Sequence, residues 1–140
     1  MNYFDMKLLA IGENEAFARN VVASFAVQCH PTIEEINDIK TAVSEAVTNC
    51  VVHAYADKTG VVQIECKIEG QNVIEIVVRD FGKGIADVKE AMEPFFTTAP
   101  DEERSGMGFT IIETFMDELS VTSAVNEGTC VRMKKVIKGC

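Results

Sequence analysis

The clearest pattern along the chain is the alternation of apolar and polar residues between positions 61 and 80. Apolar residues occupy every second position from Val61 to Glu69, and the pattern resumes from Val73 to Asp80 after the turn Gly70-Gln71-Asn72. A period of two places successive side chains on opposite faces of a strand, so these segments predict a hairpin with one face in water. Further strands are predicted over 3–11, 119–123 and 129–137, the last two as a hairpin around residues 126–128.

Helical spacing of apolar residues dominates the segments between these strands. The longest apolar stripe consists of Ile33, Ile36, Ile39, Val43, Val47, Cys50 and Ala54. Thr32 and Glu35 form a capping-box pattern at the start of that helix. Other helices are predicted over 13–28, with Phe17, Val21, Ser24, Phe25 and Gln28 at helical spacing, over 109–116, and as a short run near 87–92.

Five strands and three main helices predict the fold class. It is α+β: a two-layer α/β sandwich whose mixed, mostly antiparallel sheet is covered by helices on one face. The sequence shows neither a repeat nor a linker, so one domain spanning 1–140 is expected at this length.

Composition narrows the function classes. The chain is 47% hydrophobic and carries a net charge of -9 at pH 7. This acidic balance argues against direct binding to nucleic acid or to an anionic membrane surface, because both need a basic face. Since no apolar run approaches the roughly 20 residues of a membrane span and no signal-peptide pattern begins the chain, a cytoplasmic protein is predicted.

The cysteines indicate no metal or disulfide chemistry. They stand at positions 29, 50, 66, 130 and 140, an odd number without a Cys-x-x-Cys pair. Neither a disulfide framework nor a zinc site is therefore expected. Cys50 and Cys66 fall on apolar faces and are predicted to be small core residues.

Asp80 is the first candidate for chemistry. It shares a strand face with Ile74, Ile76 and Val78, so its carboxylate is predicted to point toward the interior or a pocket mouth. A carboxylate in that position needs a hydrogen-bond donor, and the exocyclic amine of adenine would be a suitable one. The alternative is a strand-end aspartate that accepts backbone N–H groups of the following turn.

Thr129 and two pairs of glycines add groups suited to a nucleotide. Thr129 places a hydroxyl on an otherwise apolar strand face, where it contacts adenine directly or through water, or bonds its own backbone. Gly82 and Gly84 let the backbone turn sharply and approach a flat ring. Gly106 and Gly108 precede a helix, whose exposed N–H groups favour phosphate. Each pair taken alone is also compatible with an ordinary turn or loop.

The helix that follows Thr32 carries the candidate reactive groups. Glu45, Asn49 and His53 are spaced i, i+4, i+8 and are predicted to form a stripe beside the apolar face. The amide oxygen of Asn49 suits Mg²⁺, which takes few protein ligands, and Glu45 can accept a proton from a hydroxyl or water near a γ-phosphate. His53 could contact phosphate or a neighbouring side chain. The alternative for all three is a solvated polar margin of the helix.

The segment between Gly82 and Gly108 has little periodicity. Some twenty residues without firm structure inside a compact domain indicate a lid or a binding loop.

Taken together, three motifs resemble those of the GHKL superfamily of ATPases and kinases, whose fold is called Bergerat. They are Glu45-Ala-Val-Thr-Asn49-Cys-Val-Val-His53, Asp80-Phe-Gly82-Lys-Gly84 and Gly106-Met-Gly108-Phe109. Within that superfamily the chain is most similar to the anti-sigma factor serine kinases of Bacillus-type bacteria. The resemblance spans about residues 33 to 135.

The resemblance implies a role for each matching residue. Glu45 would be the general base, Asn49 the Mg²⁺ ligand, and Asp80 the residue that reads adenine. Arg104 would act catalytically near the γ-phosphate or the partner, and an ATP lid would span about residues 93–105. The implied nucleotide-binding residues are Asn49, His53, Asp80, Gly82, Gly84, Ile85, Thr97, Thr98, Ser105, Gly106, Met107, Gly108, Phe109 and Thr129.

The resemblance also implies partners. Such proteins bind a sigma factor as homodimers, and they phosphorylate a serine of an anti-anti-sigma protein with ATP and Mg²⁺. Glu15, Arg19 and Asn20 on the first helix are the implied partner-binding residues, unless they form an ordinary solvated face. Two other functions remain open: a binding module that uses ATP or ADP only to set its shape, and an ATPase that directs water at the γ-phosphate.

Overall fold

The computed structural model describes residues 1–55, 60–86, 88, 92 and 108–139. Its strands are β1 (Asn2–Leu9), β2 (Val61–Glu69), β3 (Val73–Asp80), β4 (Glu118–Ala124) and β5 (Gly128–Val136). Its helices are α1 (Glu13–Ala26), α2 (Ile33–Asn49) and α4 (Gly108–Phe115), with a 3-10 turn η1 (Val27–Cys29) after α1 and a π-helical turn η2 (Cys50–Ala54) after α2.

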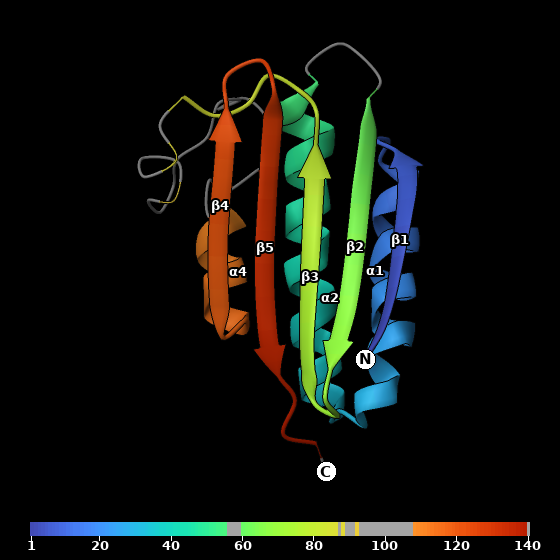
Figure 1. Cartoon of the computed structure of the whole chain (residues 1–140). Helices are drawn as coiled ribbons and strands as arrows, with labels where there is room; N and C mark the ends of the chain where they lie inside the picture. The colour runs from blue at the N-terminus through green and yellow to red at the C-terminus, as the bar shows by residue number, and fades with distance from the viewer. Residues whose placement is uncertain (56–59, 87, 89–91, 93–107, 140) are drawn as a thin grey trace.

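The strands form one sheet in the order β1-β2-β3-β5-β4 (Figure 1). All four pairs of neighbours are antiparallel. The predicted mostly antiparallel sheet is thus confirmed, and none of these pairings is parallel. The predicted hairpin is also confirmed, with Cys66 opposite Ile76 and Val62 opposite Asp80.

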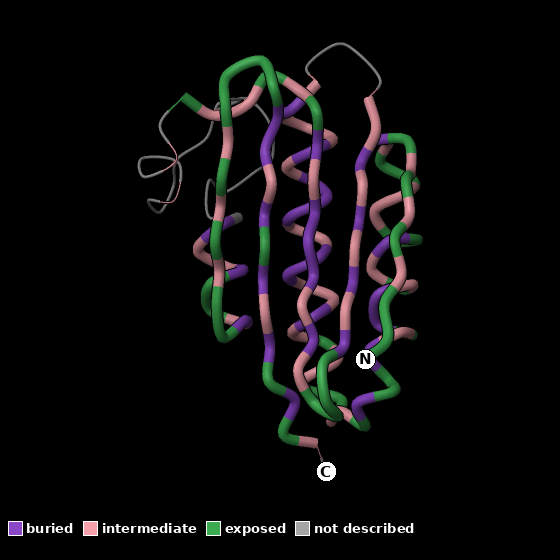
Figure 2. The backbone as a smooth tube through the Cα atoms, in the orientation of Figure 1, coloured by how far each residue is buried: buried purple, intermediate pink, exposed green. Residues whose placement is uncertain are grey.

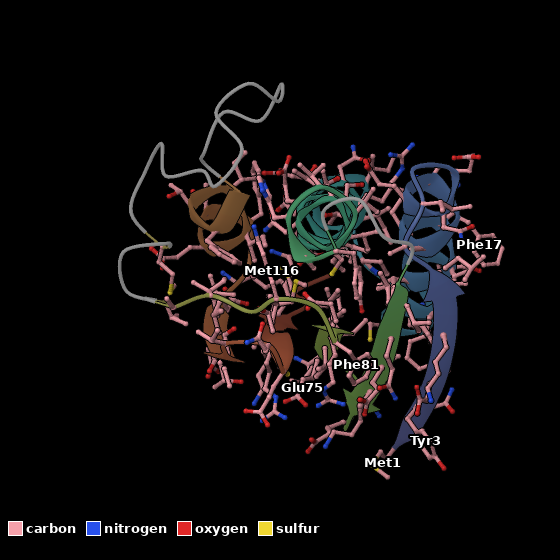
Figure 3. All side chains as sticks on the ribbon, turned by 90° about the horizontal axis from the view of Figure 1, so that it is seen from above. Met1, Tyr3, Phe17, Glu75, Phe81 and Met116 are labelled. Carbon is pink, nitrogen blue, oxygen red and sulfur yellow. The ribbon has the colours of Figure 1, made fainter. Side chains whose placement is uncertain are left out.

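The three helices cover one face of the sheet, and the other face is in water (Figure 3). The core lies between the two layers. In β2 and β3 the residues that alternate as buried in Figure 2 are the apolar members of the sequence pattern: Val62, Ile64, Cys66, Ile68, Ile74, Ile76 and Val78. The predicted two-layer α/β sandwich is therefore confirmed.

Helix α2 begins as its sequence predicts. The Thr32 hydroxyl accepts from the Glu35 N–H at 3.1 Å, and the Glu35 carboxylate accepts from the Thr32 N–H at 2.9 Å. This reciprocal capping box satisfies two donors that an isolated helix end would leave unpaired. One member of the predicted apolar stripe does not belong to the core: Ile33, the first helical residue, is 82% exposed.

The buried face of helix α1 consists mainly of small residues and does not include Phe17. Its buried residues are Ala18, Val22, Ala23 and Ala26, whereas Phe17 is 53% exposed and points away from the sheet (Figure 3). The predicted stripe instead lines an open groove with Phe4 of β1; the groove residues are Phe4, Phe17, Asn20, Val21, Ser24, Phe25 and Gln28. The small residues on the buried face allow α1 to pack closely in the core.

Several predicted boundaries shift by a few residues. The first strand ends at Leu9 rather than residue 11, and the first helix ends at Ala26, after which residues 27–29 form a 3-10 turn. The third main helix starts and ends one residue earlier than predicted. Most of the short helical run near 87–92 lies outside the described residues.

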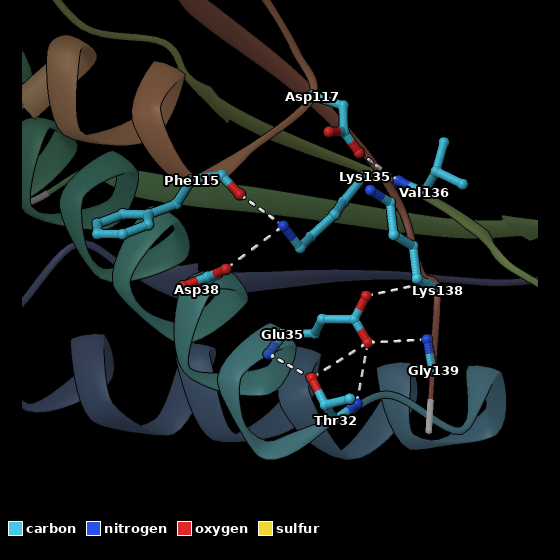
Figure 4. Close-up of polar contacts among 9 residues, drawn as sticks. All are labelled: Thr32, Glu35, Asp38, Phe115, Asp117, Lys135, Val136, Lys138 and Gly139. Carbon is cyan, nitrogen blue, oxygen red and sulfur yellow. Dashed lines mark hydrogen bonds and ion pairs between the residues drawn. The ribbon is translucent and has the colours of Figure 1, made fainter.

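The carboxylate of Glu35 also holds the chain after β5 (Figure 4). It accepts from the backbone N–H of Lys138 at 2.7 Å and of Gly139 at 3.0 Å. Burial alone would raise the pKa of this carboxyl, but the backbone donors of Thr32, Lys138 and Gly139 outweigh it and lower the pKa below its ordinary value.

We expect Glu35→Gln to reduce the free energy of unfolding at pH 7 by about 1–2 kcal/mol, because a charged acceptor shared by several N–H donors is lost. A carboxyl with a lowered folded pKa stabilises above its unfolded pKa, about 4.3, and this stabilisation is lost as pH falls through the folded pKa. Urea titrations at pH 7 and pH 3 measure the difference. Glu34→Gln, a change at an exposed neighbour, is the control. An equal loss of unfolding free energy in both variants would show that the hydrogen bonds to the Glu35 carboxylate do not stabilise the fold.

Candidate nucleotide site

Three segments that are far apart in sequence meet at one end of the sheet. The end of β3, the β4–β5 hairpin and the C-terminal end of α2 lie together there (Figure 1). Two contacts join these segments. The sulfur of Cys50, the residue directly after α2, lies 3.7 Å from Asp80 Oδ2, and the Thr129 N–H at the start of β5 donates to Asp80 Oδ1 at 3.2 Å.

Asp80 lies at the centre of this arrangement and is only 6% exposed. Its Oδ1 accepts from the backbone N–H of Gly82 at 3.0 Å and of Thr129. The interpretation as a turn-bonding aspartate is therefore correct for this oxygen. Oδ2 faces the Cys50 thiol, so the two oxygens have different surroundings. Burial raises the pKa of Asp80 above its ordinary value, and the bonds from Gly82, Thr129 and Cys50 oppose that rise.

The thiol of Cys50 keeps its proton. Burial first, and then the neighbouring Asp80 carboxylate, raises the pKa of Cys50 well above its ordinary value. A protonated thiol donates weakly, and among the described residues it is the one donor to Oδ2. Oδ2 therefore retains a lone pair for a further donor. Cys50 is a core residue, as predicted, and it also contacts the carboxylate, which the apolar pattern did not indicate.

The turn after Asp80 fits closely against the end of α2. A Cβ at Gly82 would collide with the backbone carbonyl of Ala54, and the Lys83 N–H donates to that carbonyl at 2.8 Å. Gly84 has a φ of +74° and lies against the carbonyl of Ala124. Both positions require glycine, so the sharp turn predicted from the two glycines is confirmed.

Helix α2 carries Glu45 and Asn49, both half-buried, toward this end of the sheet. The predicted spacing holds for these two residues. After Asn49 the helix widens into the π-turn η2, so His53 does not continue the regular i+4 stripe. A π-turn inserted in a helix is often found at functional sites.

Tyr55 is a residue that the sequence motifs did not single out as functional. Its hydroxyl donates to the Val61 carbonyl at 2.7 Å and accepts from the Phe81 N–H at 2.7 Å. A Cβ at Gly60 would enter the Tyr55 ring. Tyr55 therefore ties the end of η2 to the start of β2 and to the turn after Asp80.

We expect Tyr55→Phe to lower the free energy of unfolding by about 1–2 kcal/mol, since the Phe81 N–H and the Val61 carbonyl each lose a hydrogen-bond partner. Thermal or urea unfolding measures the change. Tyr3→Phe is the matched control, because Tyr3 is 68% exposed on the outer face of the sheet. Equal stability of Tyr55→Phe and wild type would show that water replaces the hydroxyl without cost.

Thr129 is 9% exposed and follows Gly128 at the start of β5. Its hydroxyl lies 2.9 Å from that of Ser123 on β4, rather than bonding its own backbone. Ser123 also accepts from the N–H of Ile85 at 2.7 Å. The structure thus brings Ile85 and Thr129 to the same end of the sheet as Asp80, and it adds Ser123, which no sequence motif indicated.

Part of the predicted site lies outside the described residues. This holds for Thr97, Thr98, Arg104, Ser105, Gly106 and Met107, and for the predicted lid over residues 93–105. Gly108 opens α4, and Phe109 packs in the core with 9% exposure. The start of α4 leaves backbone N–H groups without intrahelical partners, which is the feature that favours an anion.

The three predicted partner-binding residues lie on α1. Glu15 accepts from the buried hydroxyl of Thr48 at 2.6 Å, and Arg19 lies 3.5 Å from the Ser44 hydroxyl and 4.0 Å from Glu15. Asn20 lines the groove beside Phe4. Glu15 and Arg19 thus contact α2 at Thr48 and Ser44, the residues directly before Asn49 and Glu45.

The donor set suits a nucleotide better than a protein-bound metal cluster. Among the described residues no group of three His, Cys, Asp or Glu side chains is placed to hold a metal ion. A single amide oxygen such as that of Asn49 is compatible with Mg²⁺, which keeps waters and phosphate oxygens as its other ligands. No helix in the described part of the chain is long and apolar enough to cross a membrane.

Comparisons with known proteins agree with this geometry. The family model for the histidine kinase-like ATPase domain matches residues 12–135. Anti-sigma F factors from Caldanaerobacter subterraneus and Thermoanaerobacter pseudethanolicus are 59% and 57% identical over 136 residues, with 97% of this chain and 94% of each relative covered. The relative from Anoxybacillus flavithermus is 53% identical, with 96% and 92% covered.

Solved structures share the fold. A crystal structure of the RsbU and RsbW domains of a Mycobacterium tuberculosis protein superposes with a TM-score of 0.71 at 18% identity, covering 98% of this chain and 33% of that one. The mycobacterial sensor histidine kinase MprB superposes with a TM-score of 0.60 at 16% identity, covering 99% of each chain. From its matched domain and its close relatives, the chain belongs to the anti-sigma F factor family within the histidine kinase-like ATPases.

Proposed function

We propose that this protein binds ATP and ADP at the Asp80 end of its sheet and uses ATP to phosphorylate a serine of an anti-anti-sigma protein. In the same proposal it is an anti-sigma factor in the cytoplasm, where it sequesters a sigma factor. The observation that carries the proposal is the contact between Cys50 and Asp80, because it places the Glu45–Asn49 helix against the proposed adenine site.

At the adenine end, Asp80 would accept the exocyclic amine of the base. Oδ2 is the oxygen available, since Oδ1 already accepts two backbone N–H groups. A site built to hydrogen-bond one ligand group rejects analogues that lack it, because its buried polar atoms are then unpaired.

At the phosphate end, Asn49 would offer its amide oxygen to Mg²⁺. The ion would offset charge on the phosphate oxygens. Glu45, one helical turn before Asn49, would accept the proton of the attacking serine hydroxyl. The serine oxygen then bonds to the γ-phosphorus, the bond from that phosphorus to the bridging oxygen breaks, and ADP leaves.

For the partners, we infer that α1 is the contact face. Glu15, Arg19 and Asn20 are the proposed contacts. Self-association into a homodimer is proposed on the same side, because β1 is an edge strand and edge strands readily pair with another chain.

The experiment is incubation with Mg-[γ-³²P]ATP and an anti-anti-sigma protein, followed by identification of the labelled residue. Acid-stable label on a serine of the partner supports the kinase. Phosphate release that is unchanged by the partner would indicate a water-directed ATPase. Nucleotide-dependent partner binding without label or phosphate release would indicate a binding module.

A further inference from the structure

The Ser123 hydroxyl on β4 has three polar neighbours. It accepts from the Ile85 N–H at 2.7 Å, donates to the Gly128 carbonyl at 2.9 Å, and lies 2.9 Å from the Thr129 hydroxyl. Two of these neighbours lie beside Asp80: Thr129 bonds its carboxylate through the backbone N–H, and Gly128 lies against its backbone carbonyl.

Counting protons assigns the donors of this cluster. A backbone N–H can only donate and a carbonyl can only accept, so the single Ser123 proton must go to Gly128. The third contact is then a hydrogen bond only if Thr129 donates to Ser123. With the opposite assignment, the Ser123 and Gly128 oxygens would face each other at 2.9 Å without a proton between them.

We propose that Ser123 is a specificity-determining residue of the nucleotide site, because it takes the Thr129 proton and leaves Thr129 able only to accept. This inference rests on the proposed adenine-nucleotide function. Asp80 Oδ2 is also an acceptor, so both groups suit direct contact with the 6-amino group of adenine. The 6-oxo group of hypoxanthine or guanine is itself an acceptor and is disfavoured by both.

The test compares Mg-ADP and Mg-IDP by calorimetry in wild type, Ser123→Ala and Ser120→Ala. Removing Ser123 frees the Thr129 proton to donate, so the preference for ADP over IDP is expected to fall by about five- to tenfold. Ser120→Ala, an exposed serine on the same strand, is expected to keep the wild-type preference. If Ser123→Ala weakens the binding of both nucleotides equally, the ratio is unchanged, and the loss reflects only the missing hydrogen bonds to Ile85 and Gly128.

A double-mutant cycle with Thr129→Val sharpens the result. Without the Thr129 hydroxyl, Ser123→Ala is expected to have no further effect on the ADP-to-IDP ratio. If Ser123→Ala gives no cooperative thermal transition, Ser123→Cys replaces it, since sulfur accepts a hydroxyl proton poorly and the ratio is expected to fall in the same direction.

An unchanged ratio in a folded Ser123 variant that keeps Thr129 would overturn the inference and leave the nucleotide site intact, and so would a changed ratio when Ser123→Ala is added to Thr129→Val. Absence of binding of both nucleotides to the wild type would instead overturn the proposed function, and the inference with it.

Discussion

Replacement of Asp80 by asparagine is expected to weaken Mg-ADP binding by about 100-fold. The asparagine oxygen can still accept from Gly82 and Thr129, as Oδ1 does in the wild type. Its amide NH₂ then takes the place of Oδ2, and a donor faces the amine of adenine. The variant therefore loses one charged acceptor and gains an unpaired buried donor, while the turn after β3 stays in place.

Isothermal calorimetry of Mg-ADP binding measures this effect, with thermal unfolding to verify the fold. Asp5→Asn makes the same change of charge at an exposed position of β1, and it is expected to bind as the wild type does. Equal affinities of Asp80→Asn and Asp5→Asn would show that the base is not read at this carboxylate.

Replacement of Glu45 by glutamine is expected to slow phosphotransfer to the partner serine by about 10²- to 10⁴-fold. Glutamine has the size of glutamate but cannot take the serine proton. Mg-ADP affinity is expected to stay within about threefold of the wild type, a change of less than 1 kcal/mol, because Glu45 is not among the groups around Asp80.

Single-turnover transfer from Mg-ATP and calorimetry of Mg-ADP, performed on the same preparations, separate the two effects. Glu34→Gln, in the first turn of the same helix and exposed, is expected to transfer at the wild-type rate. If Glu45→Gln loses nucleotide binding together with transfer, Glu45 has a structural role and the general base must be sought elsewhere.

Much of the fold could be predicted because local and tertiary patterns agree. In β2 and β3 the alternation is uninterrupted and the polar turn at 70–72 fixes the register, so the predicted bounds of both strands match the structure. The same period of two placed the Asp80 side chain inward. The capping box of Thr32 and Glu35 fixed the start of α2 for a similarly local reason.

Other features depend on tertiary packing that periodicity does not encode. Helix α1 has two apolar stripes, and helical spacing alone does not say which of them is buried: Phe17 of the bulky stripe is exposed, whereas Phe25 packs against the edge of the core. The small residues Ala18 and Ala26 are fully buried in the core, where close packing favours small side chains. The π-turn after Asn49 carries no local sequence signal of its own.

The parts of the site that sequence reasoning missed are contacts between distant residues. Cys50 and Asp80 are thirty positions apart, and Ser123 meets Ile85 across thirty-eight. Each side chain alone reads as a small core or strand residue. Only the antiparallel pairing of β4 with β5 and the close approach of η2 to the turn after β3 reveal that Cys50 contacts the Asp80 carboxylate and that Ser123 is linked to it through Thr129.

The most direct test of the nucleotide site is titration of Mg-ADP into ¹⁵N-labelled protein, followed through the amide resonances of Gly82 and Thr129. Both amides donate to Asp80 Oδ1, so they report on that carboxylate. Both resonances are expected to shift with one common midpoint, while that of Gly70, in the β2–β3 turn at the opposite end of the sheet (Figure 1), stays fixed. Unchanged Gly82 and Thr129 resonances at saturating Mg-ADP would contradict the account.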